Sequence, residues 1–218
     1  GWKTQIFDVY HSMFLFKRMP IDNYYPAIYC GWLTLLFVPL YFFNIEIKLK
    51  EKICSGIFLL FMIATMLISP LYIFMHAFDA PDGYNFRHAF LLVFLLCALA
   101  GRQAAYLDNI KKIYLFVVIG IQFLGCFVTQ WIVADGGEIS TLALIANMVA
   151  PLLWLGVWSY IQKKPDDKKT IALLATVVVL VELCFNGWFC VYEPTTKLQK
   201  EYECYKEGIV SAIEELHQ

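Results

Sequence analysis

The chain has 218 residues, of which 60% are hydrophobic and 16% are charged, and its formal net charge is −1 at neutral pH. Soluble domains have about 45–50% apolar and about 25% charged residues, so this composition argues against an ordinary soluble protein. The small net charge and the lack of a basic run interleaved with aromatic residues give no reason to expect a nucleic acid partner. A lipid bilayer is therefore the expected environment.

Six apolar segments are long enough to cross a bilayer, which requires about 20 mainly apolar residues. In chain order they cover residues 25–43, 53–75, 87–107, 113–134, 140–162 and 170–192. The third is the weakest, because Arg102 and Gln103 interrupt it. We therefore predict an all-α protein, a polytopic membrane bundle of six transmembrane helices.

Two mixed segments flank this transmembrane domain, which covers 25–192. Residues 1–24 combine apolar and charged positions, which predicts an extracytoplasmic or interfacial segment. Residues 193–218 carry apolar side chains at spacings of three and four, which predicts an extracytoplasmic amphipathic helix leading to a further soluble domain. The chain begins with Gly1 and has no signal sequence pattern, so we expect it to be an interior or C-terminal piece of a longer polypeptide.

The basic residues predict the orientation in the bacterial cell membrane, because lysine and arginine accumulate on the cytoplasmic side. Ten of them occupy three connections, at residues 44–52, 102–112 and 163–169. The alternate connections 76–88 and 135–139 hold only Arg87. This asymmetry places these two loops and both ends of the chain outside the cell.

Arg87 stands out in the outer loop 76–88, which is the richest polar cluster of the chain. A guanidinium at the membrane boundary offers a rigid fork to a phosphate or carboxylate, such as the headgroup of a phospholipid or a polyprenyl phosphate. An arginine in this place also serves as a simple interfacial anchor, with its stem along apolar surface and its charge in water. Both interpretations stay open.

His76, Asp79 and His88 are further candidate substrate-binding residues of this loop. Together with Asp82 they are compatible with a divalent cation, but their spacing matches no closed ligand motif, so we assign no metal site and no certain cofactor. The stretch Pro81-Asp82-Gly83 is more simply a turn. A general base at His76 or Asp79 is chemically feasible, but a solvated loop residue needs no such role.

Glu182 lies at the middle of segment 170–192, where an ionisable group costs about 2.5–3.5 kcal/mol on insertion scales. It must therefore face protein or water. Asn186 is four residues further along the same helix face, so both are expected to bond to another helix. Conceivable partners are Gln122, Gln130, Asn147 and Arg102. Two interpretations stay open, a polar contact that joins helices and the lining of a substrate cavity.

Three stretches of the chain carry a recognisable pattern. They are Tyr29-Cys30-Gly31 with the lysine-rich loop ending at Ile53, the outer stretch His76–Pro81 with Asn85–Phe90, and Val181-Glu182-Leu183 with Asn186. In order and spacing they resemble the YfhO family of bacterial polytopic membrane proteins over most of residues 21–192. Two positions depart from that pattern, Ala77, where a glycine is expected, and His88, where tyrosine or serine is more usual.

The resemblance implies the C-terminal half of the membrane domain of a GT-C type glycosyltransferase. Such an enzyme would transfer a sugar, on the outer face, from an undecaprenyl-phosphate carrier to a cell-wall polymer such as lipoteichoic acid. Arg87 would then stabilise the charge on the leaving phosphate. The catalytic acid or base of such enzymes is usually an aspartate in an outer loop that we expect to precede this chain. Asp8 is not assigned that role, so the catalytic residue is unknown.

Two other functions stay open. In a transporter or lipid flippase, Glu182 would be a gating or coupling group. The inverted repeats and broken helices that transporters often contain are not evident in the sequence. A non-enzymatic assembly protein would use its outer tail to recruit partners and would bind them without turnover.

Overall fold

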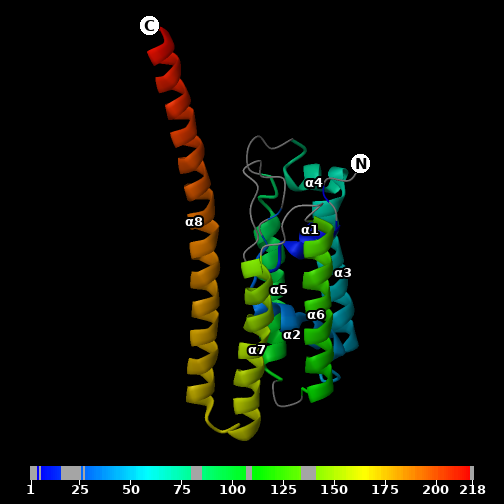
Figure 1. The fold of residues 1–218 in the computed structure, drawn as a ribbon. Helices are drawn as coiled ribbons and strands as arrows, with labels where there is room; N and C mark the ends of the chain where they lie inside the picture. The colour runs from blue at the N-terminus through cyan, green and yellow to red at the C-terminus, as the bar shows by residue number, and fades with distance from the viewer. Residues whose placement is uncertain are drawn as a thin grey trace.

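The computed structural model describes residues 4, 6–15, 26, 28–79, 85–106, 110–133 and 141–216. Among these, side chains beyond Cys190 are described only for Tyr202 and Lys206. The described residues form helices joined by turns and short extended stretches (Figure 1). In chain order the helices are α1 (Ile6–His11), α2 (Trp32–Phe43), α3 (Leu49–Leu67), α4 (Ser69–Met75), α5 (Ala89–Ala104), α6 (Lys112–Val133), α7 (Thr141–Lys163) and α8 (Lys168–Leu216). The all-α prediction is confirmed for this part of the chain.

Three helices are long and apolar enough to cross a membrane. Their membrane-length stretches are Lys112–Thr129 in α6, Thr141–Lys163 in α7 and Lys168–Cys190 in α8. They coincide with the last three predicted spans. Because such apolar lengths are stable only in hydrocarbon or in a large protein core, these helices fit a membrane protein.

The first three predicted spans are shorter or interrupted helices, so six continuous spans are not confirmed. The segment 25–43 becomes helical only at Trp32, after Gly31 with a φ of 84°. The segment 53–75 divides at Ile68, whose backbone is extended, and the next helix begins at Ser69 with Pro70 in its first turn. Pro70 has no N–H to continue α3 and is well placed in the first turn of α4. Hydropathy reports apolar length, but it does not report such breaks.

The lysine-rich connections gather at one end of the bundle. Arg102 in the last turn of α5 forms a bidentate ion pair with Glu51 in the first turn of α3. Its Nε donates to Oε1 at 2.9 Å and its Nη2 donates to Oε2 at 3.3 Å. This bond holds the pKa of the Glu51 carboxyl below its usual value. Phe43 of α2 stacks on Tyr114 of α6 near the same end, where Figure 1 also places the connection between α7 and α8. The grouping agrees with the basic asymmetry, and the direction in the membrane stays a prediction.

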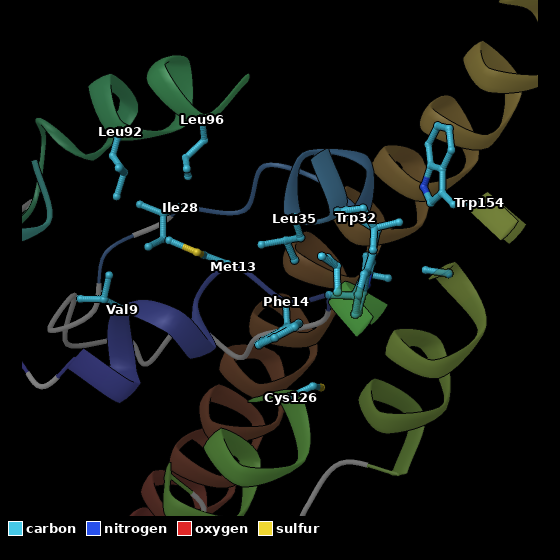
Figure 2. Close-up of a cluster of buried hydrophobic side chains, with 14 of the residues drawn as sticks. Val9, Met13, Phe14, Ile28, Trp32, Leu35, Leu92, Leu96, Cys126 and Trp154 are labelled. Carbon is cyan, nitrogen blue, oxygen red and sulfur yellow. The ribbon is translucent and has the colours of Figure 1, made fainter. Parts of the chain in front are cut away.

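The core is centred on α2, which lies against α5, α6 and α7. The N-terminal segment contributes Val9, Met13, Phe14 and Leu15 to this core. Figure 2 shows Met13 and Phe14 gathered with side chains of α2 and with the extended segment before it. Within the segment predicted to be extracytoplasmic or interfacial, Val9 and residues 12–15 are therefore buried among the helices, whereas Ile6 and Phe7 are exposed.

Asn147 of α7 fixes this segment in place. Its Oδ1 accepts from the Leu15 N–H at 2.9 Å, and its Nδ2 donates to the Leu15 carbonyl at 3.1 Å. The same amide accepts from the Trp32 indole N–H at 3.0 Å and donates to the Ala143 carbonyl at 2.8 Å. Asn147 is fully buried, and these bonds supply the partners that its polar atoms and the Leu15 backbone need.

Gln122 of α6 replaces a hydrogen bond that is missing within α2. Pro39 has no N–H, so the Leu35 carbonyl four residues earlier lacks its helical partner. The Nε2 of Gln122 donates to this carbonyl at 3.0 Å, and its Oε1 accepts from the Tyr10 hydroxyl. One buried side chain thus joins α6 to α2 and α1.

α8 is a single helix of 49 residues, which corresponds to a length of about 74 Å. The hydrocarbon core of a bilayer is only about 30 Å thick. The helix therefore continues well past the ends of its neighbours, as Figure 1 shows. The backbone of the predicted tail helix is the continuation of α8. Of the side chains that gave its amphipathic pattern, only Tyr202 belongs to the described set, and it is exposed.

Candidate functional site

Glu182 lies inside the bundle, with only 8% of its surface exposed. The Trp32 backbone N–H donates to its Oε1 at 2.6 Å, and the Tyr29 hydroxyl donates to the same oxygen. The Trp154 indole N–H donates to Oε2 at 3.4 Å. The carboxylate of α8 is therefore held by α2, by the segment before it and by α7.

The start of α2 explains why a carboxylate suits this position. The first N–H groups of a helix have no partner within the helix, and the helix dipole favours a negative charge there. Gly31 directs the chain into α2 with a φ of 84°, a conformation that residues with a side chain rarely adopt. Glu182 then caps the helix from a distant part of the chain, which offsets the cost of an ionisable group in an apolar segment.

An apolar pocket of about 350 Å³ lies between α7 and α8, beside the same carboxylate. Its walls include Ile145, Val149 and Leu153 of α7 and Val178, Phe185 and Trp188 of α8. Glu182 is the one charged residue among those that line it, and its oxygens are bonded to the groups around the start of α2. The pocket therefore offers a hydrocarbon surface, which suits a hydrocarbon chain. Glu182 therefore joins helices and also lines a cavity, and its contact with a substrate stays a prediction.

Three of the four partners proposed for Glu182 from the sequence bond to other residues in the structure. Asn147 bonds to Leu15 and Trp32, Gln122 bonds to Leu35 and Tyr10, and Arg102 bonds to Glu51. The side chain of Gln130 lies outside the described set. Asn186 is buried at 9% exposure, as expected from its place one turn after Glu182.

The actual partners, Tyr29, Trp32 and Trp154, were missed. Two of them donate through groups that a search for polar residues overlooks, a backbone N–H and an indole N–H. A usable signal was the motif Tyr29-Cys30-Gly31 directly before an apolar helix, because a free helix N-terminus inside a membrane protein requires an acceptor.

A second polar cluster lies between the C-terminal end of α4 and the N-terminal end of α5. The ring centroids of His76 and His88 are 5.2 Å apart. The Tyr72 ring contacts both, with a tilted arrangement to His76 and an edge-on arrangement to His88. The His76 Nδ1 lies 2.8 Å from the Tyr72 carbonyl, and the Tyr72 hydroxyl donates to the Asn85 Oδ1 at 2.9 Å. The two predicted histidines are thus brought together, apart from Glu182 and Asn186.

The backbone of this cluster is unusual. Ala77, Phe78 and Phe86 have φ values of 57°, 65° and 58°, and they are the non-glycine residues with positive φ in the described chain. Such conformations are costly for residues with a Cβ and tend to gather where a structure holds a specific geometry. Arg87 and Asp79 are exposed beside the histidines, and Asp82 lies outside the described residues.

These features define a polytopic helical membrane protein with a polar centre between its helices. The family model of the bacterial membrane protein YfhO matches residues 3–217. The chain therefore belongs to the YfhO family, as the sequence motifs indicated, and is a membrane protein of the bacterial cell envelope. No curated protein and no solved structure matches the chain.

Proposed function

We propose that the chain is part of a membrane glycosyltransferase that moves a sugar from an undecaprenyl-phosphate carrier to an extracytoplasmic cell-wall polymer such as lipoteichoic acid. The observation that carries the proposal is the apolar pocket between α7 and α8, two helices of membrane length. A polyprenyl chain is a hydrocarbon that reaches such a pocket from the bilayer itself. The pocket is lined almost throughout by aliphatic and aromatic side chains, which is the surface that such a chain requires.

The phosphate of the donor is assigned to the outer cluster at the start of α5. Arg87 is exposed there, at the N-terminal end of a helix of 16 residues, where the helix dipole favours an anion. In this role Arg87 stabilises the charge that develops on the phosphate as the sugar leaves. His76, Asp79 and His88 belong to the same loop as Arg87 and are assigned to the same phosphate site. Glu182 and Asn186 stabilise the helices that form the pocket. The catalytic acid or base is not assigned to any residue of this chain.

A lipid flippase is the second candidate, because two helix interruptions favour it. α2 begins at Gly31 beside Glu182, and α3 is separated from α4 at Ile68. Transporters often use interrupted helices whose free ends face a bound charge near the middle of the membrane. Broken helices are not evident in the sequence, but the structure contains them, so their absence no longer counts against a transporter.

The decisive experiment measures sugar transfer from undecaprenyl-phosphate-linked donors to lipoteichoic acid by the full-length protein in liposomes. Arg87→Ala is compared with Arg102→Ala, which removes an arginine from the opposite end of the same helix. We expect transfer to be lost with Arg87→Ala and kept with Arg102→Ala in protein that stays folded. Absence of transfer with every donor would refute the enzyme. Donor movement between leaflets that depends on Glu182 would then indicate the flippase, and tight binding without either activity would indicate an assembly protein.

A further inference from the structure

His76 and His88 are held side by side by the two ends of the outer loop. His76 directly follows α4, and His88 directly precedes α5. Their ring planes are nearly perpendicular, at 82°. Ala77 directly follows His76, and Phe86 lies two positions before His88. Both have positive φ values, so the backbone adopts a costly conformation next to each histidine.

The hydrogen bonding of His76 determines which ring nitrogen is available. A carbonyl oxygen only accepts, so the Nδ1 that lies 2.8 Å from the Tyr72 carbonyl carries the proton. The Nε2 then presents a lone pair. This atom is buried and has no hydrogen-bond partner in the described structure. Histidines that bind metal ions are oriented in this way, with the second ring nitrogen donating to a backbone carbonyl.

His88 is buried and, like His76, has a ring nitrogen without a hydrogen-bond partner. Only 5% of its surface is exposed, and neither ring nitrogen makes a hydrogen bond of normal geometry with the described residues. Buried polar atoms without a partner are rare in proteins and require an explanation.

We propose that His76 and His88 form a binding site for a divalent transition-metal ion such as Zn²⁺. Two imidazoles bound to one tetrahedral ion at about 2.0–2.1 Å place their ring centroids about 5 Å apart, and the observed separation is 5.2 Å. Nitrogen ligands favour such an ion over Mg²⁺ or Ca²⁺, which take oxygen ligands. The proposal does not depend on sugar transfer.

The described residues supply two ligands from this pair, and no group of three or more histidine, cysteine or acidic side chains suitable for a metal gathers among them. Water or an oxygen of a bound molecule would then take the remaining coordination positions. A site with open positions is of the catalytic rather than the structural type. Its position beside the exposed Arg87 suits a phosphate oxygen as the additional ligand.

The test titrates the full-length protein, purified in detergent and freed of metal with a chelator, with Co²⁺ and with Zn²⁺. Visible absorption follows Co²⁺, and competition with a chromophoric chelator follows Zn²⁺. The key variant is His76→Asn, because asparagine can still donate to the Tyr72 carbonyl while the Nε2 ligand is lost. His88→Asn removes the other ligand, and His217→Asn removes a histidine from the end of the chain as the control.

We expect wild type and His217→Asn to bind Co²⁺ with the absorption of nitrogen ligation. Each cluster variant should lose one equivalent or bind it at least about tenfold more weakly. Zn²⁺ should raise the thermal unfolding temperature of wild type and leave that of His76→Asn unchanged. Wild-type protein that binds no ion, or folded cluster variants that bind as wild type does, would overturn the proposal. If His76→Asn does not fold, His88→Asn alone decides.

Discussion

Replacing Glu182 tests whether the carboxylate holds the helices together. Glu182→Leu leaves three donors without an acceptor, the Trp32 N–H, the Tyr29 hydroxyl and the Trp154 indole. Glu182→Gln keeps one oxygen for the first two donors. It also removes the charge and turns an amide N–H₂ toward the indole, so that two donors face each other.

The expected losses follow from these contacts. An unsatisfied buried group costs about 1–3 kcal/mol, but hydrogen bonds between membrane helices average about 0.6 kcal/mol with a maximum of about 1.7. Three such groups give a loss of about 2–5 kcal/mol for Glu182→Leu. Charge-assisted bonds are about twice as strong as neutral ones, so we expect a loss of about 1–2 kcal/mol for Glu182→Gln. Leu183→Ala, at a neighbouring and half-exposed position, should change the free energy of unfolding by about 0.5 kcal/mol or less.

The free energy of unfolding is measured by titration with SDS in mixed micelles, for wild type and the three variants in parallel. The expected order of stability is wild type and Leu183→Ala, then Glu182→Gln, then Glu182→Leu. A Glu182→Leu protein as stable as wild type would refute the role of the carboxylate as a cap of α2. Equal losses in Glu182→Leu and Leu183→Ala would attribute the effect to packing of α8 instead.

Three further predictions concern other parts of the chain. Asn147→Leu should cost about 2–5 kcal/mol, since the Leu15 N–H, the Leu15 carbonyl and the Trp32 indole lose their partner. Limited proteolysis should then cleave near Leu15 sooner than in wild type. Ala77→Gly should stabilise the protein by about 0.5–1 kcal/mol. It removes the cost of about 1–2 kcal/mol that a left-handed backbone imposes on alanine, and the greater entropy of glycine in the unfolded chain offsets part of this gain. An unchanged melting temperature would contradict this prediction. Bonds from Thr170 hold the pKa of the helix-capping Asp167 below its usual 3.8. Its contribution to stability is therefore full above that value and is lost as the pH falls through the lower folded pKa, and melting curves of Asp167→Asn at descending pH should lack this loss.

Parts of the candidate site followed from residue chemistry alone. The cost of a carboxylate in an apolar segment was enough to predict that Glu182 faces protein or water, and the structure shows that it faces protein. The same reasoning could not name its partners, because backbone and indole N–H groups occur throughout the chain and become donors only where the fold brings them close. The proximity of His76 and His88, twelve positions apart in the sequence, likewise depends on where α4 ends and α5 begins.

The sequence by itself determined the membrane environment, the helical class, the family and the three long C-terminal helices, because apolar length and composition act locally and do not depend on how helices pack. Only the tertiary structure decided that α2 starts inside the bundle and that Val9 and residues 12–15 are buried. Both features are stabilised by a distant side chain, Glu182 at the start of α2 and Asn147 at Leu15. Bonds between residues more than a hundred positions apart leave no periodic pattern in the sequence, since they depend on the packed arrangement of the helices.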